Sequence, residues 1–231
     1  MRRSSIEKNM LKILFEDNHL IAVNKKNSDI VQGDKTGDIS LDQKIKEMIR
    51  VRDNKPGNVF LGVPHRLDRP VSGVLVFAKT GKALSRMNTI FRNKEAKKIY
   101  WAIVKDLPEK TEDTIHHYLI KNPEKNKSFI SSSNTPGAKL ASLTYRLIGS
   151  SENFYLLEIE LHTGRHHQIR AQLAAIGSPV KGDLKYGFPR SNKNAGISLH
   201  ARELSFIHPV QKEEIRIVAE PPEDDLFKVF F

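Results

Sequence analysis

The segment HRLDRPVSGVLVFAK, residues 65–79, leads from a charged loop into a continuous apolar run. The short run 74–78, bounded by Gly73 and Lys79, predicts a buried strand. Asp68 stands between two arginines and close to Pro70, so the pattern predicts a carboxylate held by rigid backbone and kept ionised by cations. Such a carboxylate suits a nucleophile or a general base. The alternative is a set of surface ion pairs, each worth about 0.2 to 1 kcal/mol.

Short elements are predicted on both sides of this segment. Apolar alternation and turn residues predict strands at 13–15, 20–23, 99–104, 141–148, 154–161, 197–206 and 214–218. Helical spacing predicts helices at about 41–49, 81–91 and 166–176, the first with a capping box from Ser40 and Gln43 and the second with Leu84, Met87 and Phe91 on its apolar stripe. Residues 121–137, rich in Lys, Asn, Ser and Pro, are predicted to form a loop. We therefore expect an α+β domain in which helices flank a mostly antiparallel sheet with a central cleft.

Composition favours a polyanionic partner. The 231 residues include 38 Lys and Arg against 27 Asp and Glu, a net charge of +11, which makes nucleic acid the expected partner. The chain has no Cys, so disulfides, thiolate nucleophiles and Cys-ligated metal centres are excluded. Its apolar runs are too short to cross a bilayer. We expect a cytoplasmic protein, and a monomer because no predicted helix presents an exposed apolar face.

A second segment, TGRHHQIR at residues 163–170, joins a strand to a helix. Gly164 permits a sharp turn, and the amides of the first helical turn favour an anion, where Arg165 stands. Arg170 lies about one turn later, away from the apolar stripe, where a guanidinium can bind a carboxylate or a phosphate with two hydrogen bonds. The alternative is a basic, solvated helix face.

A third segment, KKIYWA at residues 97–102, places an aromatic ring beside two lysines. In a strand Tyr100 faces away from Ile99 and Trp101, so it points toward a cleft if those two are buried. A ring next to Lys97 and Lys98 suits stacking on an unpaired base, worth about 1 to 3 kcal/mol per base. The alternative is ordinary core packing, since strands favour aromatic residues.

The histidines do not indicate a metal centre. The pairs His162 with His166 and His116 with His117 lack both an H-E-x-x-H pattern and any Cys to complete a zinc site. His65 and His167 are expected instead to donate hydrogen bonds that shape their loops.

Taken together, the segments closely resemble two motifs of RNA pseudouridine synthases of the RluA-like branch. The first is His65–Asp68 with Ser72, Gly73 and the following strand. The second is the tract 163–186 with its Gly-Arg-x-His-Gln-Ile-Arg core, followed by Gly177, Pro179, Gly182, Asp183 and Gly187. The likeness extends from about residue 13 to residue 218.

The resemblance implies an isomerase that converts uridine in ribosomal or transfer RNA to pseudouridine, without cofactor or metal. By position, it implies that Asp68 is the catalytic carboxylate, that Arg66 enters the RNA as the base leaves, that Tyr100 stacks on that base and that Arg170 pairs with Asp68. Arg165 and Gln168 support the loop or bind phosphate. The remaining predicted RNA contacts are Arg69, His167, Lys97 and Lys98.

The order of the chemical steps stays open at this point. Asp68 can first attack uracil C6, attack the sugar C1′ or abstract a sugar proton, and then assist removal of the C5 proton. In each case the target must leave the helical stack, which costs a few kcal/mol.

The sequence also departs from the family's pattern. Residues 1–11 are too short for the S4-type RNA-binding module that precedes many relatives, so we expect one catalytic domain over 12–231 that binds RNA through its own basic surface. The usual Asn-Lys-Pro is Asn24-Lys25-Lys26 here, and His166 and Val71 stand where Thr is common.

Two other functions remain alternatives. One is an RNA-binding protein without catalysis, which explains the charge but not Asp68. The other is a nucleoside glycosylase or glycoside hydrolase, which requires a second carboxylate from Glu158 or Asp183.

Overall fold

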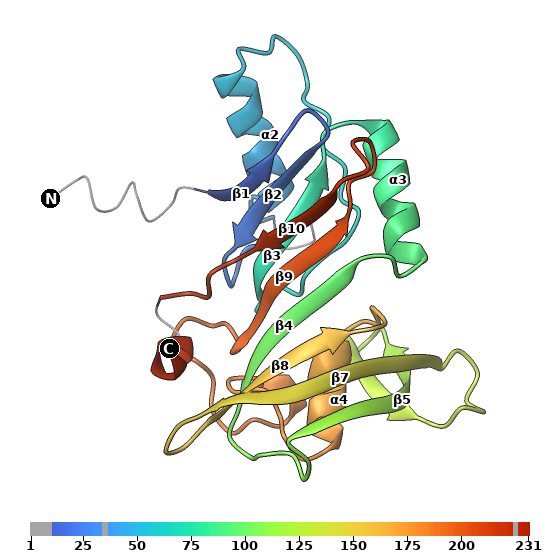
Figure 1. Cartoon of the computed structure of the whole chain (residues 1–231), viewed down its shortest axis with the longest axis vertical. Coiled ribbons are helices and arrows are strands. Elements are labelled where there is room, and N and C mark those ends of the chain that lie inside the picture. The colour runs from blue at the N-terminus through green and yellow to red at the C-terminus, as the bar shows by residue number, and fades with distance from the viewer. Residues whose placement is uncertain (1–10, 34–36, 224–225) are drawn as a thin grey trace, which may run out of the picture.

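The computed structural model describes residues 11–33, 37–223 and 226–231. In this part of the chain, ten strands form one mixed sheet (Figure 1). Within that part the spatial strand order is β1-β2-β3-β9-β4-β8-β7-β5-β6, and β10 pairs with β9. The strands are β1 Lys12–Glu16, β2 Leu20–Lys25, β3 Ser72–Ala78, β4 Lys97–Val104, β5 Glu112–Asn122, β6 Lys127–Ser131, β7 Lys139–Ser150, β8 Tyr155–Leu161, β9 Leu199–Ile207 and β10 Glu214–Val218. All pairings are antiparallel except the short β3–β9 contact, which confirms the predicted α+β class.

Two helices cover opposite faces of the β1–β3 region, because the side chains of β2 and β3 alternate between two apolar clusters. Ile21, Val23, Leu75 and Phe77 pack with helix α2, Leu41–Arg52, while the intervening residues of both strands pack with helix α3, Gly81–Arg92. Helix α2 begins with the predicted capping box, in which the backbone N–H of Ser40 donates to Gln43.

The predicted stripe of α3 is only partly right. The fully buried residues are Ala83 and Met87, with Ile90 close to them, whereas Leu84 and Phe91 are half-buried at the edge of the same cluster. The buried face of α3 is therefore rotated by about one residue from the predicted stripe, and it packs against β3.

Gly73 fixes the junction between the first motif and the sheet. It has φ of +119°, and a Cβ at this position would lie 2.2 Å from the carbonyl oxygen of Ala201 in β9. Only glycine allows β3 to approach β9 this closely with this backbone conformation. The parallel contact of Ser72 with His200 and Gly73 with Ala201 follows directly after the loop that carries Asp68. The loop is thereby anchored where β3 enters the sheet.

The second half of the sheet contains two strands that the sequence analysis did not predict. Residues 121–137 include the end of β5 and all of β6, which pair as a hairpin, so the predicted loop is wrong for these residues. Their polar side chains resemble a loop because one face of the hairpin is exposed. Helix α4, Gln168–Ala175, lies against β5 and β6 (Figure 1).

The end of the described chain packs on the far side of β4 from Tyr100. The short helix η2, Leu226–Phe230, buries Phe227 against Ile103 and Leu156, and Phe231 stacks on Trp101. No helix among the described residues is long and apolar enough to span a membrane. The expected N-terminal extension lies almost wholly outside the described residues.

Candidate active site

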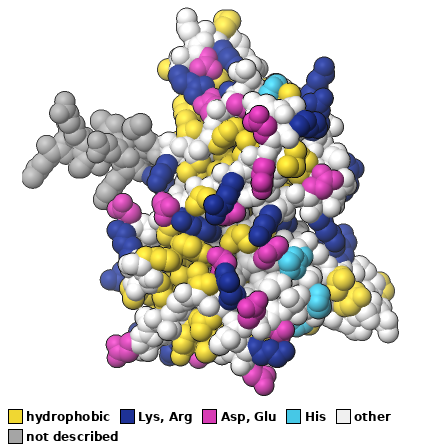
Figure 2. All heavy atoms as spheres, viewed as in Figure 1, with side chains coloured by type: hydrophobic (Ala, Val, Ile, Leu, Met, Phe, Trp, Pro, Cys, Tyr) yellow, Lys and Arg dark blue, Asp and Glu magenta, His cyan; other side chains and the backbone are white. Residues whose placement is uncertain are grey.

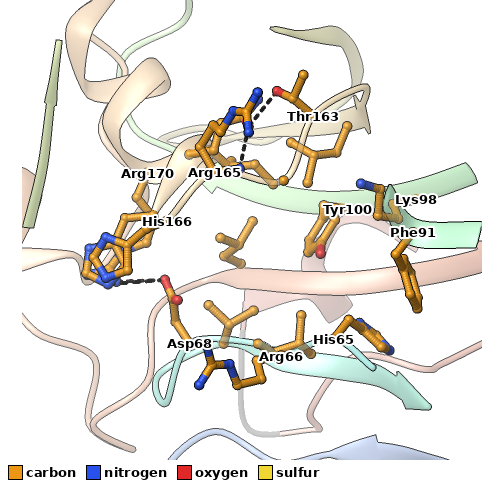
Figure 3. Close-up of a pocket in the computed structure, with 18 of the residues that line it drawn as sticks. His65, Arg66, Asp68, Phe91, Lys98, Tyr100, Thr163, Arg165, His166 and Arg170 are labelled. Atoms are coloured by element: carbon orange, nitrogen blue, oxygen red, sulfur yellow. Dashed lines mark hydrogen bonds and ion pairs between the residues drawn. The ribbon is translucent and has the colours of Figure 1, made fainter. Parts of the chain in front are cut away.

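The three sequence segments converge on one cavity of about 840 Å³. The loop of the first motif, strand β4 and the loop of residues 163–170 form its walls (Figure 3). Its described lining includes a single carboxylate, Asp68, and the cationic side chains of Arg66, Arg92, Lys94, Lys98, Lys121, Arg165 and Arg170. On the face drawn in Figure 2, by contrast, Lys and Arg are spread among Asp and Glu. The cavity is therefore an anion-attracting site built around one negative charge.

Asp68 is held in the cavity by a residue 102 positions away in the sequence. Arg170 Nη1 donates to Asp68 Oδ2 at 3.0 Å, and the side chain of Asp68 is 28 % exposed. Nε2 of His167 lies 3.5 Å from the same oxygen. The carboxylate thus faces a charged partner on one side and keeps access to the cavity on the other. This is the pairing that the resemblance implied for Arg170.

Arg170 is in turn oriented by Asp183, which lies directly before the short helix η1, Leu184–Tyr186. Nε and Nη2 of Arg170 donate to the two carboxylate oxygens of Asp183 at 2.6 and 2.9 Å, and Asp183 is 1 % exposed. The ring of Tyr186 lies 5.1 Å from the guanidinium carbon. Two parallel hydrogen bonds and an aromatic face leave Nη1 aimed at Asp68.

His167 closes the same wall as a neutral ring. Its backbone is left-handed, with φ of +52°, which ends the turn and starts α4 two residues later than predicted. Its Nδ1 lies 3.1 Å from the hydroxyl of Tyr186. Burial lowers the pKa of His167 to about 3, although the nearby charge of Asp68 acts in the opposite direction. The ring of His166 stacks on it at 3.8 Å.

Gln168 and Arg165 make contacts that hold the loop of residues 163–170. The side-chain carbonyl of Gln168 accepts from the Thr163 hydroxyl at 2.7 Å and from the backbone N–H of Arg165 at 2.9 Å, and its amide donates to the carbonyl of Ser142. Nε of Arg165 donates to the carbonyl of Leu140 while the side chain lines the cavity. Gln168 is buried, so its contacts are those of loop support.

Tyr100 faces the cavity, on the opposite side of β4 from Trp101. Burial raises the pKa of its hydroxyl, and the charge of Asp68 raises it further, so the phenol is neutral. Lys98 lines the cavity with it. Lys97, the next residue, does not line the cavity and lies 3.7 Å from Glu160. Of the two lysines predicted to contact RNA, the structure therefore brings only Lys98 to the site.

The two arginines near Asp68 in the sequence, Arg66 and Arg69, also lie in different environments. Arg66 is exposed and lines the cavity, whereas Arg69 is paired with Asp38 at 2.7 Å and lies outside the lining. His65 shapes the loop as expected but as an acceptor: its Nε2 receives the backbone N–H of Val76 at 3.0 Å.

The family model for RNA pseudouridylate synthases matches residues 19–175 of this chain. The chain belongs to this family. An uncharacterized RNA pseudouridine synthase of Synechocystis sp. is 36% identical over 163 residues, which cover 70% of this chain and 50% of that protein. This chain therefore spans about half the length of that relative.

Two other relatives match over most of this chain. Ribosomal large subunit pseudouridine synthase C of Rickettsia prowazekii is 33% identical, covering 91% of this chain and 68% of that protein. tRNA pseudouridine synthase C of Vibrio cholerae is 32% identical, covering 91% of both chains. The solved structure of human RNA Pseudouridylate Synthase Domain Containing 4 has the same fold, with a TM-score of 0.80, 22% identity and coverage of 95% of this chain and 91% of that one.

In this member of the family the departure at Asn24-Lys25-Lys26 keeps a buried lysine. Lys25 is 1 % exposed, and its ammonium donates to the carbonyls of Lys26, Arg69 and Val71 at 2.7 to 3.0 Å. Two of these carbonyls lie in the loop that carries Asp68. The ammonium therefore ties that loop to β2, a role that the sequence analysis missed because only the tertiary structure brings the segments together.

Asp183 and Tyr186 were also missed as site residues, although both belong to the second motif. Their signal was the fixed spacing after Arg170, but spacing alone does not identify the partner of a carboxylate. Among the described residues no group of three His, Cys, Asp or Glu has the geometry of a metal site.

Proposed function

We propose that this chain isomerises uridine in RNA to pseudouridine and that Asp68 is its catalytic carboxylate. The observation that carries the proposal is Asp68, the single carboxylate among the described residues that line the cavity, which pairs with Arg170 and shares the space with Tyr100 and seven Lys and Arg side chains. A polyanion enters such a cavity, and one ionised group remains available for chemistry.

The reaction needs little besides a positioned carboxylate. The N1–C1′ bond breaks and a C5–C1′ bond forms, while C5 loses a proton and N1 gains one, so the change is redox-neutral. Asp68 acts first on the base or the sugar and then assists removal of the C5 proton. Arg170 orients the carboxylate of Asp68, to which it donates a hydrogen bond, and the charge of Arg170 is itself balanced by Asp183.

Access to C5 and C1′ requires the target nucleotide to leave the RNA stack. Tyr100 supplies a neutral aromatic face for the everted base, and stacking of this kind is worth about 1 to 3 kcal/mol per base. Arg66, which is exposed and lines the cavity, fills the vacated position in the RNA in this proposal. The proposed setting is the cytoplasm, with a monomeric enzyme acting on ribosomal or transfer RNA, the two classes named in the relatives.

Neither of the two carboxylates considered for the glycosylase alternative, Glu158 and Asp183, lines the cavity. Asp183 is buried and engaged by Arg170, and Glu158 lies outside the cavity lining, 2.9 Å from Arg146. A hydrolytic mechanism with two cooperating carboxyl groups is therefore disfavoured.

Incubation of the purified protein with ribosomal and transfer RNA transcripts, followed by pseudouridine mapping, tests the proposal. Asp68→Asn keeps the size of the side chain and removes its charge, so product formation is expected to fall about 10³-fold or more while RNA affinity is retained. Asp113→Asn, which alters an exposed carboxylate paired with Lys110, serves as the matched control. Free uracil as product would indicate a glycosylase, and RNA binding without product would indicate a binding protein; either result contradicts the proposal.

A further inference from the structure

Lys98 and Lys97 are neighbours in β4 with opposite environments. Lys98 precedes Tyr100 by two residues and lines the same cavity, as expected for side chains on one face of a strand. Lys97 is exposed and outside the cavity, near Glu160. The close-up shows Lys98 and Asp68 on either side of Tyr100 (Figure 3).

The ammonium of Lys98 is partly desolvated and lacks a counter-ion. In residues 11–33, 37–223 and 226–231, no carboxylate lies within ion-pair distance of its Nζ and no hydrogen bond to it is formed. The charge that acts on this ammonium is that of another cation, Lys94, and His65, which lines the same cavity, is neutral because burial lowers its pKa to about 3. Burial, reinforced by Lys94, lowers the pKa of Lys98.

An unpaired ammonium in such a place lowers the stability of the folded chain. A site of this kind becomes favourable when a ligand brings the missing negative charge. The only anionic groups of an RNA strand are its backbone phosphates. Nζ of Lys98 faces the backbone of Gly164, where a Cβ would lie 3.8 Å from it, so this position contributes no side chain that contacts the ammonium.

We propose that Lys98 binds the backbone phosphate adjacent to the everted uridine, so that β4 holds the target nucleotide at two points, its base on Tyr100 and its phosphate on Lys98. The inference rests on the proposed function and adds a phosphodiester subsite to it. Lys97 has no part in this subsite, although the sequence places both lysines beside Tyr100.

The test compares Lys98→Met, Lys98→Arg and the matched control Lys97→Met on a transcript containing the mapped uridine. Loss of a charge-assisted hydrogen bond predicts that Lys98→Met weakens RNA affinity about ten-fold or more. It also predicts a shallower slope of log affinity against log salt concentration, by the amount that corresponds to one phosphate contact. Lys98→Arg is expected to retain affinity, and Lys97→Met to behave like the unmodified protein.

A second arm identifies the phosphate itself. The RNA affinities of the unmodified protein and of Lys98→Met are measured with transcripts that carry an uncharged methylphosphonate at either of the two linkages next to the uridine. At one of the two linkages, the methylphosphonate is expected to weaken RNA binding by the unmodified protein as much as Lys98→Met does. The same methylphosphonate is expected to leave the affinity of Lys98→Met unchanged.

The free energy of unfolding, measured without RNA, shows whether Lys98→Met damages the fold or only removes the phosphate subsite. Removal of an unpaired, partly buried charge predicts that Lys98→Met is at least as stable as the unmodified protein. The inference is overturned if Lys98→Met and Lys97→Met have equal affinities and salt slopes, or if the methylphosphonate loss adds fully to that of Lys98→Met. Failure of the proposed function is distinct, since the unmodified protein then yields no pseudouridine in any transcript, while the affinities and salt slopes of Lys98→Met and Lys97→Met can still be compared on the ribosomal and transfer RNA transcripts.

Discussion

Arg170 Nη1 lies 3.0 Å from Asp68 Oδ2, while the remainder of its guanidinium is bound by the buried Asp183. One cation thus joins two carboxylates of unequal exposure. The inner one is fully engaged and fixes the direction of the arginine. The outer one keeps one side toward the cavity, which is the geometry that a reacting carboxylate requires.

Asp183→Asn tests whether the orientation of Arg170 matters for turnover. Asparagine retains one acceptor oxygen but loses the bidentate pairing, and the buried guanidinium of Arg170 loses one of its two negatively charged partners. The free energy of unfolding is therefore expected to fall by about 3 kcal/mol. Single-turnover rates are expected to fall at least ten-fold, because Nη1 is no longer aimed at Asp68, while RNA affinity changes little. Asp29→Asn, which removes a partner of the exposed Lys44, is the control for stability. A turnover rate unchanged in Asp183→Asn would contradict the positioning role.

Replacement of Tyr100 separates stacking from hydroxyl chemistry. Tyr100→Ala removes the aromatic face, and the loss of about 1 to 3 kcal/mol predicts a 5- to 150-fold slower single turnover. Tyr100→Phe retains the ring and is expected to stay within a few-fold of the unmodified rate if stacking is the main contribution. RNA affinity, measured in parallel, is expected to change less than the rate in Tyr100→Ala. Equal losses of rate and affinity would remove Tyr100 from the active centre.

Gly73→Ala tests the junction that anchors the Asp68 loop. The new Cβ would lie 2.2 Å from the Ala201 carbonyl oxygen at a φ of +119°, so both a backbone clash and conformational strain result. A loss of about 3 kcal/mol or more in the free energy of unfolding is expected. Gly57→Ala is the control, because a Cβ there meets no atom within 4 Å. Urea titration of both variants measures the difference, and comparable stabilities would show that β3 and β9 can separate at little cost.

The acid stability of the fold depends on buried neutral histidines. Nε2 of His200 lies 3.0 Å from the Ala219 carbonyl, to which it donates, and Nδ1 accepts from the Ser72 hydroxyl at 2.8 Å. Burial lowers the pKa of His200 from 6.5 to about 4. Between these values the unfolded chain binds a proton that the folded chain does not, so stability falls as the pH falls through this window. The contribution is about 1.4 kcal/mol per pH unit at most.

Urea titrations from pH 7 to pH 4 measure this dependence. His65 and His167, whose pKa values are also lowered by burial, to about 3, act in the same direction. His200→Gln is therefore expected to reduce the steepness of the pH dependence by about one proton without abolishing it. The same steepness in His200→Gln and in the unmodified protein would show that His200 is not the group that titrates.

Most of the fold was predicted from the order of the two motifs and from the alternation of apolar residues. Strands β2, β3, β4 and β8 are strongly patterned because they are buried on at least one face, and the structure has them within a few residues of the predicted bounds. The hairpin of β5 and β6 was missed, since its exposed face carries Lys, Asn and Ser, as a loop does. What makes it a hairpin is pairing with β7 and contact with α4.

By itself, the sequence determined the residue types and the spacing that chemistry needs: a carboxylate between arginines before a buried strand, an aromatic residue in another strand and an arginine after a glycine turn. Tertiary structure alone decided which of the similar side chains act together. Arg66 and Lys98 reach the cavity, whereas their near neighbours Arg69 and Lys97 pair with Asp38 and Glu160 outside it. The reason is geometric: neighbouring positions on a strand or a tight loop point in different directions, and only the packing of distant segments shows which direction holds the ligand.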